Sequence, residues 1–195
     1  MQNKVLYIHG FNGSPNGTTG SFVKSFFSDD IVVASNFDLL DYEGTLSKIK
    51  KIIDDNDINI IVSHSFGSFY TLALNDDETF KILINPCMFP SIEIPPLSNP
   101  PLDTEWIEEF QKKETEIYSQ VNGLVSQTTF AIFGNNDELF SYYETFNEYY
   151  GTSSLQNKKN SIVLPGTHRL SNNSLERGLA CAIDYSSVFE NIMKR

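Results

Sequence analysis

The chain has 195 residues, enough for one domain with a full hydrophobic core, and 40% of them are hydrophobic, as in an ordinary globular protein. Its 25 acidic and 14 basic side chains give a formal net charge of −11, which disfavours nucleic-acid and anionic membrane partners. Met1 leads directly into an apolar segment rather than an export leader, and the two cysteines, Cys87 and Cys181, lie far apart. We therefore expect a cytoplasmic protein with free thiols.

Six short apolar segments predict the strands of a sheet. Most are apolar on both faces, as in a parallel sheet that helices cover on both sides. The segments span residues 5–8, 31–34, 58–62, 81–84, 129–133 and 161–164.

Amphipathic stretches between these segments predict helices. One is expected to begin at Thr45 as its N-cap, and the last to run over residues 174–193 with Ser174 as N-cap. Two more are predicted at about residues 66–75 and 139–150. The alternation predicts an α/β fold with a compact, doubly wound, mainly parallel sheet of about six strands and helices on both faces.

Residues 88–125 interrupt this alternation. Prolines crowd the first half of the segment and argue against a helix or strand there, whereas residues 103–120 form a polar, helix-like run. We interpret the segment as an insertion within a single domain of residues 1–195. It would lie over the carboxyl edge of the sheet as a lid, or it would be a plain surface excursion.

The strongest chemical signal is a serine between a predicted strand and a predicted helix. Residues 60–69 read Ile-Ile-Val-Ser-His-Ser-Phe-Gly-Ser-Phe, which is the nucleophile-elbow pattern around Ser65. A strained turn there lifts the serine Oγ clear of the backbone, and strand and helix approach so closely that only small residues fit two positions away. Gly67 meets this demand, and Ser63 replaces the commoner glycine. The alternative is a serine in an ordinary turn.

A nucleophilic serine needs a general base and an acid that orients it, and in this fold they follow in the order Ser, Asp, His. Asp137 lies in a Gly-Asn-Asn-Asp loop after one predicted strand, and His168 lies in a Pro-Gly-Thr-His-Arg loop after the last. We predict Ser65 as nucleophile, Asp137 as acid and His168 as base. Glu138 is the competing carboxylate, and surface roles for Asp137 and His168 are the alternatives.

An oxyanion needs preorganised N–H donors, and two backbone groups are candidates. One is the N–H of Phe66, directly after the predicted nucleophile. The other is the N–H of Phe11, because Gly10 lets the loop after the first strand bend close to the substrate. We expect His9 and His64 to support the site or contact substrate, with Gly10 and Gly67 beside them.

Other kinds of site find no match in the sequence. The glycines of residues 10–20 lack the Lys-Ser/Thr pair and the spacing of phosphate-binding loops. Residues 54–57 resemble only the beginning of a calcium loop, and no His/Cys cluster has zinc spacing. We therefore predict no metal site and no cofactor.

Together the motifs resemble the YqiA-like esterase family of the α/β-hydrolase superfamily. The resemblance covers nearly the whole chain and rests on residues 7–15, 63–70, 83–86 (Leu-Ile-Asn-Pro), 134–137 and 166–169. It implies an α/β-hydrolase fold, activity on acyl esters including thioesters, no cofactor, and the same three catalytic residues. The chain departs from the family pattern at Ser63 and Ser68, where glycine is more usual, and in a longer segment between Pro86 and Thr128.

The leading hypothesis is a serine hydrolase of the carboxylesterase type that acts on a small-molecule acyl ester or thioester. One alternative is a peptidase or amidase that uses the same three residues. The other is a catalytically silent α/β-hydrolase that serves as a binding module. A silent member would be expected to lack a member of the triad, and none is missing here.

Overall fold

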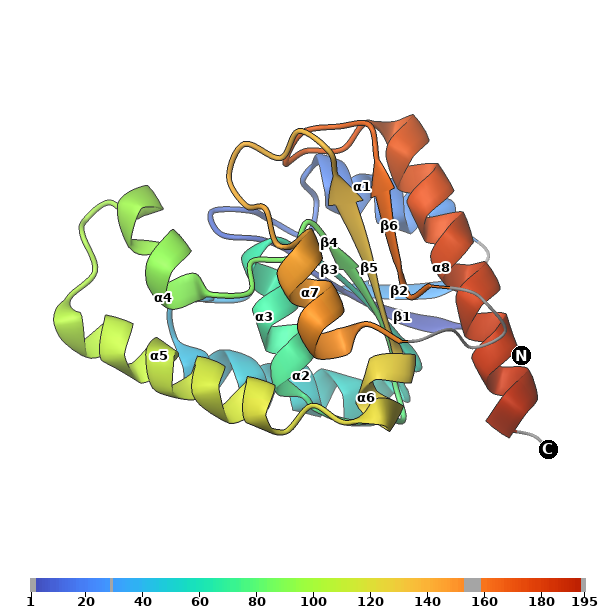
Figure 1. The fold of residues 1–195 in the computed structure, drawn as a ribbon, viewed down its shortest axis with the longest axis horizontal. Helices are drawn as coiled ribbons and strands as arrows, with labels where there is room; N and C mark the ends of the chain where they lie inside the picture. The colour runs from blue at the N-terminus through green and yellow to red at the C-terminus, as the bar shows by residue number, and fades with distance from the viewer. Residues whose placement is uncertain (1–2, 29, 153–158, 194–195) are drawn as a thin grey trace.

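A computed structural model describes residues 3–28, 30–152 and 159–193 (Figure 1). Its centre is a parallel sheet of six strands in the order β2-β1-β3-β4-β5-β6. The strands are β1 (Lys4–Ile8), β2 (Ile31–Ala34), β3 (Ile60–His64), β4 (Phe80–Ile84), β5 (Thr129–Gly134) and β6 (Ser161–Leu164). Each predicted strand is present, so the predicted doubly wound α/β sheet is confirmed.

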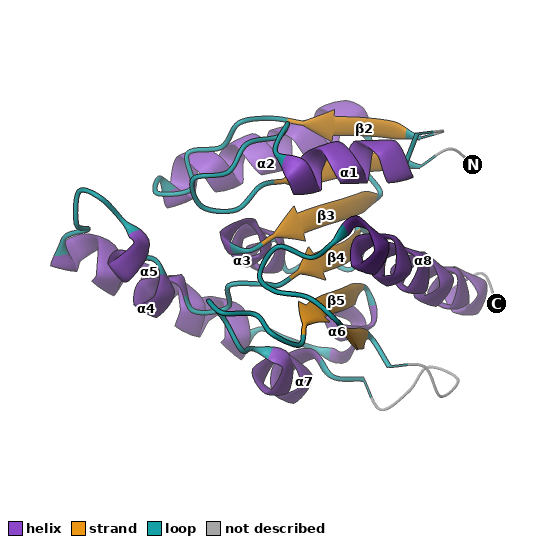
Figure 2. Ribbon diagram, turned by 90° about the horizontal axis from the view of Figure 1, so that it is seen from above, coloured by secondary structure: helices purple, strands orange, loops and turns teal. Residues whose placement is uncertain are grey.

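Helices cover both faces of the sheet, with α1 and α8 on one side and α2, α3 and α7 on the other (Figure 2). The helices are α1 (Thr18–Phe26), α2 (Tyr42–Asn56), α3 (Phe66–Ala73), α4 (Pro90–Glu93), the 3₁₀ helix η1 (Pro95–Leu97), α5 (Thr104–Ser119), α6 (Gly123–Gln127), α7 (Tyr143–Tyr150) and α8 (Asn172–Met193). In the described part of the chain, none of them combines the length and the apolar character that crossing a membrane requires.

The period of two along each strand divides the buried side chains into two cores. In β3, Ile61 packs into the core that includes helix α3, whereas Ile60 and Val62 pack into the core that includes α1 and α8. Since both faces of the central strands are buried, these strands are apolar throughout, and their hydrophobic runs do not alternate.

The order of the strands alone, without any side chain, indicates which edge of the sheet should carry a site. From β1 the chain moves one way to β2, and from β3 it moves the other way through β4 and β5 to β6. Ligands of open parallel sheets bind outside the carboxyl ends of the strands at such a reversal. The loops after β1 and β3 border this point, and they carry Gly10 and Ser65.

The predicted starts of two helices are wrong, and both errors have a local cause. Helix α2 begins earlier than predicted, because the Asp41 side chain accepts the N–H of Gly44 as the cap, and Thr45 instead bonds the carbonyl of Asp38 within the first turn. At α8, Ser171 accepts the N–H of Ser174, so Ser174 is inside the helix. In both places the sequence offers two possible capping residues three or four positions apart, and the prediction chose the wrong one.

The prediction that prolines exclude any helix from the first half of residues 88–125 is also wrong. Pro90 occupies the start of α4, where a missing N–H removes no helical hydrogen bond, and the helix ends before Pro95. The predicted polar run is α5, with Asp103 as its N-cap.

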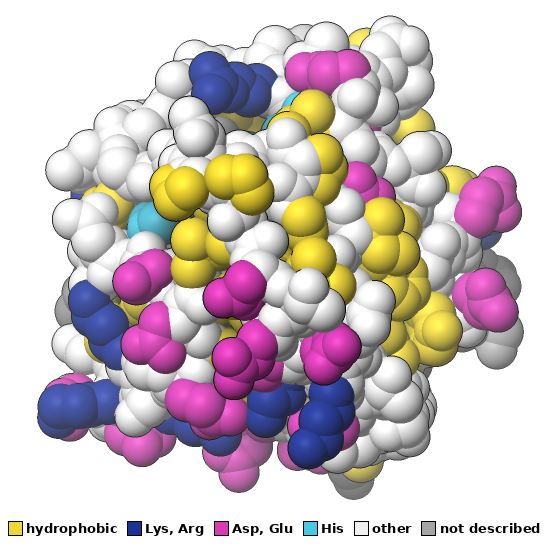
Figure 3. Space-filling view, turned by 90° about the vertical axis from the view of Figure 1, so that its left-hand side faces the viewer, with side chains coloured by type: hydrophobic (Ala, Val, Ile, Leu, Met, Phe, Trp, Pro, Cys, Tyr) yellow, Lys and Arg dark blue, Asp and Glu magenta, His cyan; other side chains and the backbone are white. Residues whose placement is uncertain are grey.

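Residues 88–125 are packed onto the rest of the described structure. The Trp106 ring stacks on Phe110 at 4.0 Å between centroids, and its Nε1 donates to the carbonyl of Leu40. Near α4, the carboxylate of Glu114 accepts both the N–H and the hydroxyl of Ser91. Figure 3 shows hydrophobic side chains gathered across the middle of the face on the α4 and α5 side of the molecule. Ile92 of α4 and Leu97 of η1 are exposed.

Gly67 offers a test of the close approach between α3 and β1. A Cβ at this position would lie 2.8 Å from the carbonyl oxygen of Ile8 and closer still to that of His9. We expect Gly67→Ala to lower the free energy of unfolding by about 1–3 kcal/mol, because backbone must move. Urea unfolding measures it. Gly123→Ala is the control: this helical glycine has nothing within 4 Å of the added carbon and should be neutral or slightly stabilising. Equal effects in the two variants would contradict the packing argument.

Candidate active site

Ser65 connects β3 to α3 in a strained conformation. Its φ of 55° and ψ of −126° lie outside the regions that a residue with a side chain normally adopts, at a cost of about 1–3 kcal/mol. Two backbone hydrogen bonds hold the turn: the Ser65 N–H donates to Ile84, and the Ser65 carbonyl accepts the N–H of Cys87. The predicted elbow is therefore supported from the end of β4.

The loop after β1 closes against this serine. A Cβ on Gly10 would lie 2.8 Å from the Cβ and 3.3 Å from the Oγ of Ser65, so only glycine fits. The Gly10 carbonyl accepts the N–H of Gly13 and lies 2.9 Å from Nδ1 of His9. Since Nε2 of His9 accepts the N–H of Phe37, Nδ1 is the nitrogen that donates. His9 therefore supports the backbone of this loop.

The two predicted oxyanion donors have no competing acceptor. The Phe11 N–H belongs to the same planar peptide as the Gly10 carbonyl and points the opposite way, away from His9 and Gly13. The Phe66 N–H is at the first position of α3, where helical partners are absent. In residues 3–28, 30–152 and 159–193, no acceptor bonds either group. Both are available to a developing negative charge.

Asp137 and His168 form a hydrogen-bonded pair. The Asp137 oxygens lie 2.9 and 3.1 Å from Nδ1 of His168, and both side chains are almost fully buried. Asp137 also accepts the N–H groups of Leu139 and Phe140. Burial raises the pKa of Asp137, but the hydrogen bonds from the His168 ring and the two N–H groups outweigh it, so its pKa lies below the ordinary value. The carboxylate is therefore ionised at neutral pH.

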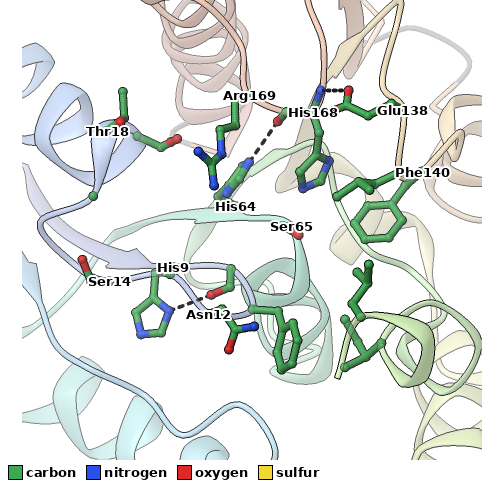
Figure 4. A pocket seen from close by; sticks show the side chains of 18 of the residues that line it. His9, Asn12, Ser14, Thr18, His64, Ser65, Glu138, Phe140, His168 and Arg169 are labelled. Carbon is green, nitrogen blue, oxygen red and sulfur yellow. Dashed lines mark hydrogen bonds between the residues drawn. The ribbon is translucent and has the colours of Figure 1, made fainter. Parts of the chain in front are cut away.

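Glu138, the competing carboxylate, has a different partner. Its Oε2 accepts the backbone N–H of His168 at 2.9 Å, a bond that lowers the pKa of Glu138 (Figure 4). The ring of His168 also meets the edge of Phe140, at 4.9 Å between centroids. The carboxylate next to the ring is thus that of Asp137, and Glu138 holds the main chain of His168.

Ser65 and His168 line one cavity of about 600 Å³, together with His9, Gly10, His64 and Phe11. Within the described residues, no hydrogen bond joins the Ser65 Oγ to the His168 ring. Such hydrogen bonds are often long in the absence of substrate, so the missing bond does not contradict the predicted roles of Ser65 and His168. No group of three or more His, Cys, Asp or Glu side chains in the described part of the chain could hold a metal ion.

Asn85 is a site residue that sequence reasoning did not single out. It follows β4 with a φ of 42° and is buried. Its Oδ1 accepts the N–H of Gly134, and its Nδ2 donates to the carbonyls of Thr167 and His168. One side chain therefore fixes the loop of the acid and the loop of the base. The only signal was an asparagine in the Leu-Ile-Asn-Pro motif, at the carboxyl end of a buried strand.

His64 supports the base from the other side. Its Nε2 lies 3.2 Å from the His168 carbonyl, and the two rings lie 5.1 Å apart. Burial, and next the charge of His168, lower the pKa of His64 to about 4. His64 is thus neutral at physiological pH, and its Nε2 donates to the carbonyl.

The lowered pKa of His64 predicts an acid-sensitive stability. Between pH of about 6.5 and about 4, the unfolded chain binds a proton at this residue and the folded chain does not, so stability falls as the pH falls. We expect a loss of about 1–2 kcal/mol across this window, reduced by water in the cavity because the ring is half-buried. Urea unfolding from pH 4 to 7.5 should show a flatter profile for His64→Gln. Parallel profiles would refute the assignment.

A second prediction concerns Asn85. In Asn85→Ala, the Gly134 N–H and the Thr167 carbonyl lose their side-chain partner, at about 1–3 kcal/mol for each buried group left unpaired. The loops that carry Asp137 and His168 should also shift relative to each other. We therefore expect a fluorophosphonate to label Ser65 at least about tenfold more slowly. Asn160→Ala is the matched control, because Asn160 also bonds buried carbonyls, those of Ser126, Thr129 and Tyr150. It should lose stability and keep the labelling rate; equal labelling in both variants would exclude the positioning role.

Comparison with known proteins supports the fold and gives the family. Est1E from Butyrivibrio proteoclasticus matches with a TM-score of 0.64 at 16% identity, over 97% of this chain and 89% of its own. Alpha/beta hydrolase domain-containing protein 10 from mouse matches with a TM-score of 0.61 at 14% identity, over 98% and 92%. A haloalkane dehalogenase variant, DbeA-M1 from Bradyrhizobium elkanii, matches with a TM-score of 0.59 at 11% identity, over 100% and 92%.

At these identities the structural matches show the fold alone, and they confirm the predicted α/β-hydrolase fold. No curated protein matches the chain. A family model described as Uncharacterised protein family (UPF0227) matches residues 4–182, which confirms the resemblance to the YqiA proteins. The chain belongs to the UPF0227, or YqiA, family of α/β hydrolases.

Proposed function

We propose that this protein is a serine hydrolase that cleaves carboxylic esters, including thioesters, with Ser65 as nucleophile, His168 as general base and Asp137 as the orienting acid. The observation that carries the proposal is the hydrogen bond between Asp137 and Nδ1 of His168. With Nδ1 engaged by the carboxylate, Nε2 is the ring nitrogen that can take and return a proton. The same ring lines the cavity of Ser65.

In the first half of the reaction, the Ser65 Oγ attacks the acyl carbon and passes its proton to Nε2 of His168. The carbonyl electron pair moves onto oxygen, where the N–H groups of Phe11 and Phe66 stabilise the negative charge. The intermediate then collapses: the bond to the leaving oxygen or sulfur breaks, and His168 donates the proton to the departing alcohol or thiol. An acyl ester of Ser65 remains.

In the second half, water attacks the acyl ester and gives a proton to His168. The bond to the Ser65 Oγ breaks, and His168 returns the proton to that oxygen, which restores the enzyme and releases the acid. Asp137 stabilises the imidazolium that forms in both halves. Each step therefore balances with water as the only co-reactant.

The choice of ester chemistry rests on the walls of the cavity and on the family. Apolar side chains line part of the space in front of Ser65, which suits an acyl group: Phe11, Ile94, Leu97, Leu139 and Phe140. Membership of the YqiA family agrees with this substrate class. A binding module without activity has no use for a strained serine backbone with two free N–H groups beside it.

Substitution of the nucleophile tests the proposal. We expect Ser65→Ala to reduce hydrolysis of 4-nitrophenyl hexanoate by at least about 10⁴-fold, because no acyl-enzyme can form. Fluorophosphonate labelling should disappear as well, while the free energy of unfolding stays near the parent value. Ser25→Ala is the control, since Ser25 is an exposed serine of α1 outside the cavity lining and should keep both activities. Full turnover by Ser65→Ala, or an unlabelled parent protein, would overturn the assignment.

A further inference from the structure

One cation lies at the mouth of the candidate active site. Arg169 directly follows the predicted base and lines the cavity, and it is the only Lys or Arg among the lining residues. Its side chain is exposed, and no carboxylate in the described chain pairs with it. The nearest carboxylate in the lining, Glu138, already accepts the backbone N–H of His168.

The cavity has different chemistry on its two sides. Figure 4 shows the Arg169 guanidinium and Thr18 on one side of Ser65, and Phe140 on the other. The hydroxyls of Ser14 and Thr18 and the amide of Asn12 are exposed in the cavity wall, whereas Ile94, Leu97 and Leu139 supply its apolar part. A ligand that spans the nucleophile therefore meets a cation and hydroxyls at one end and hydrocarbon at the other.

Arg169 is a positive charge in a protein whose net charge is strongly negative. With a formal net charge of −11, the protein repels anions at long range. A positive charge beside two histidines also disfavours the imidazolium that catalysis requires, and the charge of Arg169 contributes to the lowered pKa of His64. An anionic group bound to the guanidinium would cancel this unfavourable field and add charge-assisted hydrogen bonds.

We propose that the enzyme acts on amphiphilic esters that are apolar at one end and carry a carboxylate or phosphate at the other, with Arg169 binding the anion. This inference rests on the proposed function and names its substrate class. Arg169 acts on specificity: it stabilises the bound ester, and the bonds at the acyl carbon are still made and broken by Ser65 and His168.

Matched esters test the proposal. The first series is 4-carboxyphenyl, 4-phosphonophenyl and neutral 4-carbamoylphenyl hexanoate; the second carries the charge on the acyl side, as phenyl hydrogen adipate and its neutral monoamide. We expect Arg169→Gln to lower kcat/KM for the anionic members of one series by about tenfold more than for the neutral member, because it removes a charge-assisted bond. Comparing variant with parent for each ester cancels differences in intrinsic reactivity. The carboxylate and phosphonate arms tell which anion is preferred.

Two controls sharpen this test. Arg177→Gln removes the same charge from an exposed position on α8 outside the cavity lining and should leave the preference unchanged. Arg169→Lys should retain part of it as a point charge, and added salt should weaken it in the parent. If Arg169→Gln affects charged and neutral esters equally in both series, the inference is wrong while the hydrolase assignment stands. If the parent cleaves no ester and resists fluorophosphonate, the proposed function itself fails.

Discussion

The site depends on one constraint, the strained turn at Ser65, and on the backbone contacts that make the strain tolerable. A residue with a φ of 55° and a ψ of −126° persists only where its surroundings leave no alternative. Here Ile84 at the end of β4 accepts the Ser65 N–H, and Cys87 donates its N–H to the Ser65 carbonyl. Gly10 and Gly67 let two other segments approach the turn closely. The N–H groups of Phe11 and Phe66 directly follow Gly10 and Ser65 in the chain, so the strained turn and the two predicted oxyanion donors have one structural origin.

The position of His168 depends on main-chain contacts as much as on Asp137. Asp137 orients the ring of His168, but the backbone of that residue is bonded by Glu138 at its N–H and by Asn85 and His64 at its carbonyl. These contacts fix a loop that has no regular secondary structure around it, and they hold the imidazole in the wall of the cavity that Ser65 also lines. Polar residues that bond the main chain therefore decide where the ring of His168 lies.

The sequence predicted the strands and the loops of Ser65, Asp137 and His168 because each carries a local signal: a buried apolar run, or small and polar residues directly after one. Helix α1 carried only scattered phenylalanines and was not predicted. Asn85 was not found because its role needs β4, β5 and β6 to be neighbours, which no local pattern contains. Thr45 and Ser174 failed as caps since a second capping residue lay three or four positions away.

The sheet topology also separates the predicted reacting residues from the residues that form the apolar wall of the cavity. Residues at the strand ends supply the reacting groups, and they are fixed by the sheet. The apolar wall comes partly from Ile94 and Leu97 of residues 88–125. Tyr142 donates to Glu93 from outside this segment, and Ser91 donates to Glu114 within it. Burial raises the pKa of Glu114, and the two donors from Ser91 oppose it. Under the proposed function, changes in this segment or at Arg169 would therefore alter which ester is bound while the geometry at Ser65 stays the same.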